Sequence, residues 1–224
     1  MTKKVLAVLI MATTSSLATD GSFSNHALTT KAGTLGVGIG YSTNITKNFD
    51  LRIGANSFSY AMDSTMQDID YSLDTRLSTV SAILDYHLFS SAFTLSGGFV
   101  YNNNGADFTG EAKGGKFIID GNEYEIGDIG SLNGKIGFDP ISPYIGIGYS
   151  TVTKFKGLHF TAEMGVLYQN TAITSLDVQC EDGLPPAECA KLKNDVLSEK
   201  ESLDEDIEDY KWYPVVSLGL AYTF

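Results

Sequence analysis

The fold is decided by the stretch VSLGLAYTF, residues 216–224, in which every second side chain is large and apolar. Only the small residues Ser, Gly, Ala and Thr stand between Val216, Leu218, Leu220, Tyr222 and Phe224. Alternation with a period of two is typical of a β-strand. In a soluble sheet the second face would meet water and carry charges. A face of small residues instead suits a narrow barrel interior, and the unbroken apolar face suits lipid.

The same alternation recurs along most of the sequence. It predicts strands over residues 33–43, 50–60, 72–88, 92–102, 143–151, 157–169 and 213–224. Single-chain bacterial barrels have an even number of strands, so we assign Ser22 to Thr30 to the first strand despite its poor pattern. Because open sheet edges do not persist in hydrocarbon, the sheet must close. The predicted fold is all-β, a closed antiparallel transmembrane β-barrel of about eight strands.

The orientation of the two faces has one alternative. A soluble barrel of the lipocalin type would turn the apolar face inward and the small face toward water.

The pattern within residues 72–88 changes phase near Thr79, which predicts a β-bulge in that strand.

The connections between the predicted strands alternate in length. Short ones at 44–48, 89–91 and 152–156 separate long ones at 62–71, 103–142 and 170–212. Outer-membrane barrels have short periplasmic turns and long extracellular loops, so the two sets predict the two ends of the barrel. Within the second long loop, Asp120-Gly121 stands between alternating residues and predicts a β-hairpin.

Both ends of the sequence carry export signals. Lys3 and Lys4 precede an apolar run and the small residues of Ser16-Leu17-Ala18, which predicts a signal peptide over 1–18 and a barrel domain over 19–224. That run is shorter than the roughly 20 residues of a membrane-spanning helix. Tyr222 and Phe224 resemble the C-terminal signal recognised by the barrel-assembly machinery, which we expect as a partner.

Composition excludes several classes of function. The chain has 15 Lys and Arg against 27 Asp and Glu, so a surface for nucleic acid is not expected. Cys180 and Cys189 follow the signal peptide and predict one short disulfide in an oxidising compartment. Their spacing does not fit a CxxC metal or redox site. The acidic loop of Asp63, Asp68 and Asp70 lacks the order of a calcium loop, and no metal or cofactor is expected.

The last long loop contains a helical pattern. Apolar residues recur at helical spacing from Pro186 to Tyr210, at Cys189, Leu192, Val196, Leu203, Ile207 and Tyr210. Pro186 suits the start of a helix. The pattern predicts an extramembrane, acidic amphipathic helix of about six turns. We expect it to pack on the barrel rim, and the second possibility is a protein partner at residues 187–210.

A few ionisable residues fall on the small face and therefore inside the predicted barrel. They form a predicted polar network of the lumen, made of Arg52, Asp85, His87, His159 and Glu163. Arg52 and Asp85 fall near the periplasmic rim, where they are placed to pair. Tyr144 adds bulk to the same interior. Charges in so narrow a space need partners, which favours a polar network that fills the barrel.

Catalysis by His159, Thr161 and Glu163 is the sharper hypothesis for the same face. Lipid A deacylase barrels use a His, a Ser and a Glu, but their nucleophile faces the lipid substrate. Here Thr161 is expected to face the lumen, and a Thr nucleophile without a terminal amine is unusual. The prediction is therefore that the protein is not an enzyme.

Three longer stretches carry a family resemblance, namely KAGTLG at 31–36, FDPISPYIGIG at 138–148 and KWYPVVSLG at 211–219. They resemble the small outer-membrane β-barrel proteins of Gram-negative bacteria, barrels of the outer-membrane protein A type. The resemblance implies an outer-membrane location, with lipid and lipopolysaccharide as surroundings, and no catalytic or ligand-binding residues.

Three functions remain open at this point. The first is a non-enzymatic barrel with a structural or surface-interaction role. The second is a narrow channel for ions or small solutes. The third is an enzyme that modifies outer-membrane lipids.

Overall fold

The computed structural model describes residues 25–66, 69–112, 116–119, 121–125, 129–152, 155–180 and 184–224. The expected signal peptide and its cleavage site lie outside these residues, as does the beginning of the expected first strand.

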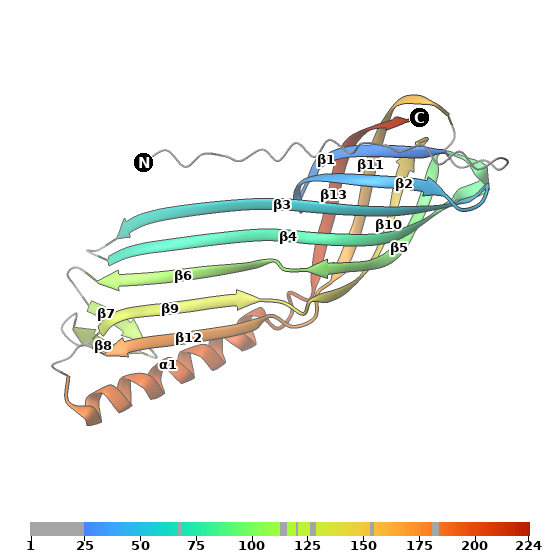
Figure 1. Cartoon of the computed structure of the whole chain (residues 1–224). Helices are drawn as coiled ribbons and strands as arrows, with labels where there is room; N and C mark the ends of the chain where they lie inside the picture. Colours follow the sequence, from blue (N-terminus) through green and yellow to red (C-terminus); the bar gives the residue numbers. More distant parts are fainter. Residues whose placement is uncertain are drawn as a thin grey trace.

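Eight strands form a closed antiparallel barrel (Figure 1). They are β1 His26–Gly33, β2 Gly36–Asn44, β3 Phe49–Met66, β4 Ile69–His87, β5 Phe93–Asn102, β10 Ile141–Ser150, β11 Gly157–Tyr168 and β13 Trp212–Thr223. Each pairs with the next around the barrel, and the β13–β1 ladder closes it. The predicted fold is confirmed, including a first strand that extends to Gly33.

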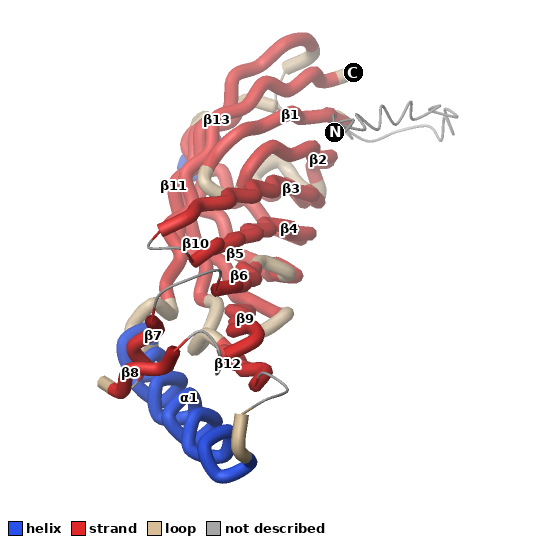
Figure 2. Tube along the Cα trace, turned by 90° about the vertical axis from the view of Figure 1, so that its left-hand side faces the viewer, coloured by secondary structure: helices blue, strands red, loops and turns tan. Residues whose placement is uncertain are grey.

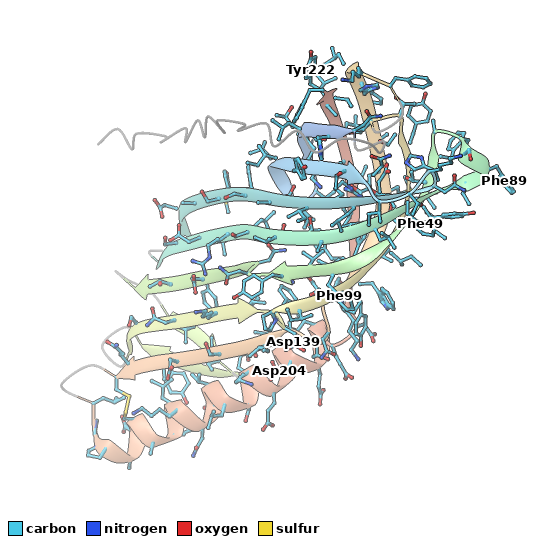
Figure 3. All side chains as sticks on the ribbon, turned by 45° about the vertical axis from the view of Figure 1, so that its right-hand side comes forward. Phe49, Phe89, Phe99, Asp139, Asp204 and Tyr222 are labelled. Carbon is cyan, nitrogen blue, oxygen red and sulfur yellow. A yellow bond between two sulfur atoms is a disulfide. The ribbon has the colours of Figure 1, made fainter. Side chains whose placement is uncertain are left out.

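The outer face of the barrel is an exposed apolar band, as the alternation predicts. It includes Val37, Ile39, Ile53, Val80, Leu84, Leu95, Phe99, Ile145, Ile147, Phe160, Met164, Leu218 and Leu220, all at least 42% exposed. In Figure 3, Phe99 points away from the barrel wall. Leu35 is an exception, because the tight turn between β1 and β2 directs it into the lumen, where it is 8% exposed. Such a band is the surface that lipid requires.

Three further strands lie in the segments predicted to be long loops. They are β6 Gly105–Ala112, β9 Ile129–Gly137 and β12 Ile173–Cys180. Together with the far halves of β3 and β4 they form a sheet in the order β3-β4-β6-β9-β12, which we call the outer wall. Figures 1 and 2 show this wall rising from one side of the barrel only. It lies opposite the short turns, so we refer to its end as extracellular.

The prediction of a β-bulge near Thr79 is wrong. The β3–β4 register runs without a shift from Phe49 and Tyr86 to Met66 and Ile69. The change of phase instead marks a change of surroundings at the pair Ser57 and Ser78. On the barrel side of this pair the outward face is apolar, and on the wall side the inward face is apolar. Lipid therefore surrounds the first part and water the second.

One helix and one hairpin cover part of the outer wall. The hairpin of β7 Lys116–Ile119 and β8 Asn122–Glu125 confirms the Asp-Gly signal. The helix α1 Pro186–Ile207 starts at the predicted proline and ends three residues before Tyr210. Its side chains Leu192 and Val196 share a core with Val178 of β12, Ile119 and Tyr124. Among the described helices, none is both long and apolar enough to cross a membrane.

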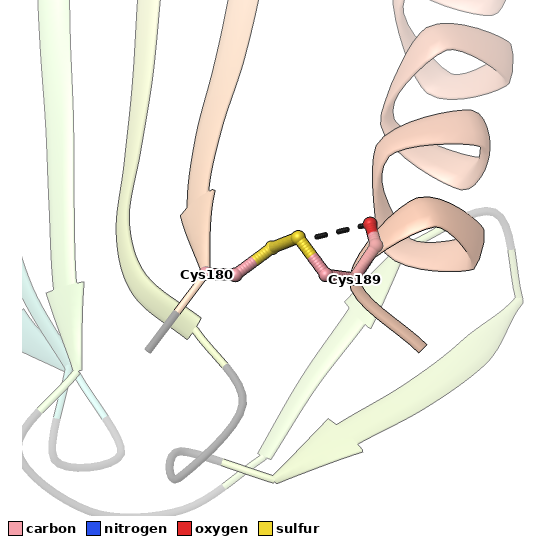
Figure 4. The surroundings of a disulfide bond; sticks show 2 residues. All are labelled: Cys180 and Cys189. Atoms are coloured by element: carbon pink, nitrogen blue, oxygen red, sulfur yellow. Dashed lines mark hydrogen bonds between the residues drawn. A yellow bond between two sulfur atoms is a disulfide. The ribbon is translucent and has the colours of Figure 1, made fainter. Parts of the chain in front are cut away.

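The expected disulfide joins β12 to the first turn of α1 (Figure 4). The Cα atoms of Cys180 and Cys189 are 5.9 Å apart. This link is close to the core around Leu192 and Val178, so it restrains the same helix that the core holds.

Removing the disulfide should loosen α1 and leave the barrel intact. In the double variant Cys180→Ser, Cys189→Ser, the stability of the α1–β12 unit should fall by about 2–3 kcal/mol, because a short loop is no longer closed. Hydrogen exchange should then accelerate in α1 and β12 while amides of β13 stay protected. Unchanged exchange in α1 would contradict this assignment.

The far end of α1 is held by a charged contact that should depend on pH. The Lys200 ammonium, 2.5 Å from Asp204, and the Thr174 hydroxyl of β12 both donate to the Asp204 carboxylate and lower its pKa. A lowered pKa stabilises docking above the ordinary Asp value of about 4, and this contribution is lost as the pH falls through the folded value. Protease cleavage near α1 should increase in that acidic range for the wild type. Asp204→Asn should flatten this dependence, and an equally steep response in the variant would contradict the assignment.

Candidate functional site: a charged plug in the lumen

Arg52 of β3 is the central residue of the charged network in the lumen. Its Nε and Nη2 atoms donate to the two carboxylate oxygens of Asp85 on β4, at 2.9 and 3.1 Å. Its Nη1 and Nη2 atoms donate to the two oxygens of Glu163 on β11, at 2.8 Å each. A guanidinium has the planar fork geometry for such bidentate pairs. Because β3 and β11 are not neighbours in the barrel, the Arg52–Glu163 pair crosses the lumen.

Further groups satisfy the same two carboxylates. Lys31 of β1 lies 3.9 Å from Glu163, and the Tyr144 hydroxyl donates to Glu163 at 2.7 Å. The Ser96 hydroxyl donates to Asp85 at 2.5 Å. We call Lys31, Arg52, Asp85 and Glu163 the charged plug. Its two cations and two anions balance, which is what a largely buried set of charges requires.

Lys31 is a member of the site that was not predicted from the sequence. The signal for it was present, because Lys31 stands on the small face of its strand, two residues from Thr29 and from Gly33. A lysine at such a position faces the lumen and needs an anion there.

Two glycines make room for the plug. A Cβ atom at Gly146 or at Gly165 would overlap the hydroxyl end of the Tyr144 ring. Both lie on the lumen face, on β10 and β11. Their lack of a side chain lets the Tyr144 ring lie along the wall and reach Glu163.

The two histidines of the predicted network bond near the short turns rather than to Arg52. The His87 ring is 1% exposed, with Nε2 at 2.7 Å from Asp50 and Nδ1 at 3.1 Å from the Ser91 carbonyl. The His159 ring nitrogens lie 2.9 Å from the Thr151 hydroxyl and 2.7 Å from the Phe155 carbonyl. Both therefore fasten the ends of strands to the adjacent turns.

This arrangement does not assemble a triad from His159, Thr161 and Glu163. Both ring nitrogens of His159 bond to residues of the preceding turn, and both oxygens of Glu163 accept from Arg52. Among the described residues there is also no group of three or more potential metal ligands.

Buried apolar clusters lie on either side of the plug. Toward the short turns, Val152 turns inward, where it packs with Ala27 and Ala221, all at most 3% exposed. Toward the outer wall lies a buried cluster of Leu35, Ile83, Val100, Tyr144, Leu167 and Val215. A cavity of about 50 Å³ remains around the plug, lined by lumen-facing residues such as Thr29, Ser42 and Thr161. An eight-stranded barrel leaves an interior that side chains can fill.

The residues of the expected assembly signal lie on the outer face at the end of β13. Tyr222 is 58% and Phe224 41% exposed. Figure 3 shows Tyr222 at the end of the barrel remote from Asp204 of α1. The Phe224 amide donates to the His26 carbonyl at 3.0 Å, so the last residue also extends the closing ladder.

Breaking the plug should destabilise the barrel. In Arg52→Ala, Asp85 and Glu163 lose their shared partner, and the free energy of unfolding should fall by up to about 3–5 kcal/mol. Urea unfolding in detergent, read from the mobility of unboiled samples on a gel, measures the loss. Lys47→Ala removes an exposed cation from a turn and serves as the matched control. Equal stability of the two variants would show that the plug does not hold the barrel.

Comparisons with known proteins agree with the fold. No family model and no curated protein matches the chain. Among solved structures, Acinetobacter baumannii CarO2 is similar with a TM-score of 0.57 at 18% identity, over 91% of this chain and 100% of that chain. Acinetobacter baumannii CarO has a TM-score of 0.55 at 20% identity, over 88% of this chain and 97% of that chain. The chain thus has the fold of a small outer-membrane β-barrel protein, similar in structure to CarO2 and CarO.

Proposed function

We propose that the chain is a non-enzymatic barrel of the bacterial outer membrane that does not conduct ions and that presents its outer wall outside the cell. The barrel fold fits that location. The observation that carries the proposal is the double bidentate pairing of Arg52 with Asp85 and Glu163 across the lumen. A balanced plug between two buried apolar clusters supports a lumen without a continuous water column.

The outer wall supports a surface role. It adds an ordered sheet, a hairpin, a helix and a disulfide to a barrel that closes without them. In this proposal the exposed face of α1, with Leu197 at 53% and Tyr210 beyond its end at 71% exposure, contacts a protein partner. Outer-membrane lipid and lipopolysaccharide surround the apolar band of the barrel, and the barrel-assembly machinery recognises Tyr222 and Phe224.

A narrow channel is the second candidate. The observation that favours it is the cavity of about 50 Å³ around the plug, which gives the charged side chains space to rearrange. A transient break of the Arg52–Glu163 pair would be needed for each passage.

Planar-bilayer recordings separate the two candidates. The wild-type barrel should show no steady conductance, because each pair that crosses the lumen blocks water. The variant Arg52→Ser, Glu163→Ser should open a small conductance if it still folds, as checked by gel mobility without boiling. Lys47→Ser is the control and should stay closed.

Steady, ion-selective openings of the wild type would overturn the closed-barrel proposal. Arg52 and Glu163 would then be selectivity residues of a channel.

A further inference from the structure

The outer wall has an apolar surface on the face that continues the lumen. We call it the inner apolar face, and it consists of Phe58, Tyr60 and Met62 on β3, Leu73 and Leu77 on β4, and Phe108 on β6. Direct pairing of Phe58 with Leu77, Met62 with Leu73, and Leu73 with Phe108 places them on one side of the sheet. The opposite side of the same strands carries Ser57, Ser59, Asp74 and Arg76.

The described residues cover only part of this side of the wall. Over β9 and β12, Leu132, Leu176 and Val178 pack against α1 and the β7–β8 hairpin. Over β3, by contrast, Phe58 is 47%, Tyr60 54% and Met62 45% exposed. A contiguous exposed apolar surface on a structure bathed in water indicates a binding site.

The wall is open on the side next to this surface. It continues β3, β4, β5, β10 and β11 of the barrel, whereas β13, β1 and β2 end at the rim (Figures 1 and 2). Gly36 lets the β1–β2 turn lie directly against Phe58. Its φ is +92°, and a Cβ there would lie 2.6 Å from the Cβ of Phe58. Its neighbour Val37 is 64% exposed on the lipid-facing band and pairs with Ser57. The inner apolar face is thus continuous with the lipid surface across the β1–β2 turn.

We propose that the inner apolar face binds the alkyl chain of a single-chain amphiphile that arrives from the water outside. From Phe58 to Met62 the strand spans about 14 Å at the usual rise of about 3.4 Å per residue, enough for a chain of medium length. The outward side chains of the same segment include Ser59, Asp74 and Arg76, so this part of the sheet stands outside the hydrocarbon. A leaflet lipid would have to leave hydrocarbon to reach it and would gain nothing, whereas a free amphiphile leaves water.

The head group should be uncharged or cationic. The chain has a net charge of −12, and the repulsion of this field disfavours an anionic amphiphile. The β1–β2 turn at Gly36 then offers the bound chain a lateral path into the lipid. This inference is separate from the closed lumen, because the binding surface lies outside the barrel.

Photo-crosslinking in lipid nanodiscs tests the inference. The probe is a dodecyl glycoside with a diazirine at the end of its chain, added from solution, and mass spectrometry locates the adducts. Wild-type adducts should map to the segment from Phe58 to Leu77 and should be competed by unlabelled dodecyl glycoside. A phospholipid that carries a diazirine in its chain should label the outer band instead.

Two variants differ only in the face that they alter. Tyr60→Asp places a carboxylate on the inner apolar face and should reduce labelling about tenfold, because a charge beside the chain would be desolvated without a partner. Ser59→Asp places the same group on the polar side of the same strand and should label like the wild type. Unboiled gel mobility confirms that both barrels fold.

Three results would overturn the inference. They are equal labelling of the two variants, labelling of the inner apolar face by the phospholipid in place of the added glycoside, and sedimentation of the nanodisc-free protein as a dimer whose interface buries Tyr60.

Discussion

The ladder between β1 and β13 is the interaction on which the rest of the structure depends. In hydrocarbon no water can bond to a free backbone amide or carbonyl, so a sheet with edges cannot exist there. Closing eight strands removes both edges and fixes a narrow lumen. That width in turn decides what the lumen contains. Glycines such as Gly146 and Gly165 leave the room that the Tyr144 ring and the charged plug occupy.

The second organising constraint is the change of surroundings along β3 and β4. A continuous register carries these strands from lipid into water, and the apolar side chains change face at Ser57 and Ser78. Within the membrane the outside must be apolar and the inside is filled by small and paired polar groups. Outside the membrane the relation reverses, and the inward face packs against α1 and the β7–β8 hairpin or stays exposed. One pair of strands therefore belongs to two different environments.

The sequence was sufficient for the barrel because lipid enforces strict alternation, as in residues 216–224. The disulfide, the hairpin and the helix were also predictable, since each depends on local signals. β9 was missed because Gly134 interrupts its inward face between Leu132 and Ile136, and the Phe108 ring of another strand fills that gap. The bulge at Thr79 was wrongly predicted because only the tertiary structure shows whether each face of the strand meets lipid or water. The pairing of Arg52 with Glu163 on β11 depends on closure of the barrel, so local spacing could not predict it.

In the closed barrel that we propose, Arg52 is held in the lumen by Asp85 and Glu163. The most direct measurement is nuclear magnetic resonance of the Arg52 side chain in micelles, with the guanidinium protons observed at neutral pH. We expect resolved Nε and Nη protons that exchange slowly with water, because all three nitrogens donate to Asp85 or Glu163. Rapid exchange with water, with a single averaged guanidinium signal, would mean that the lumen is wet and the plug is open.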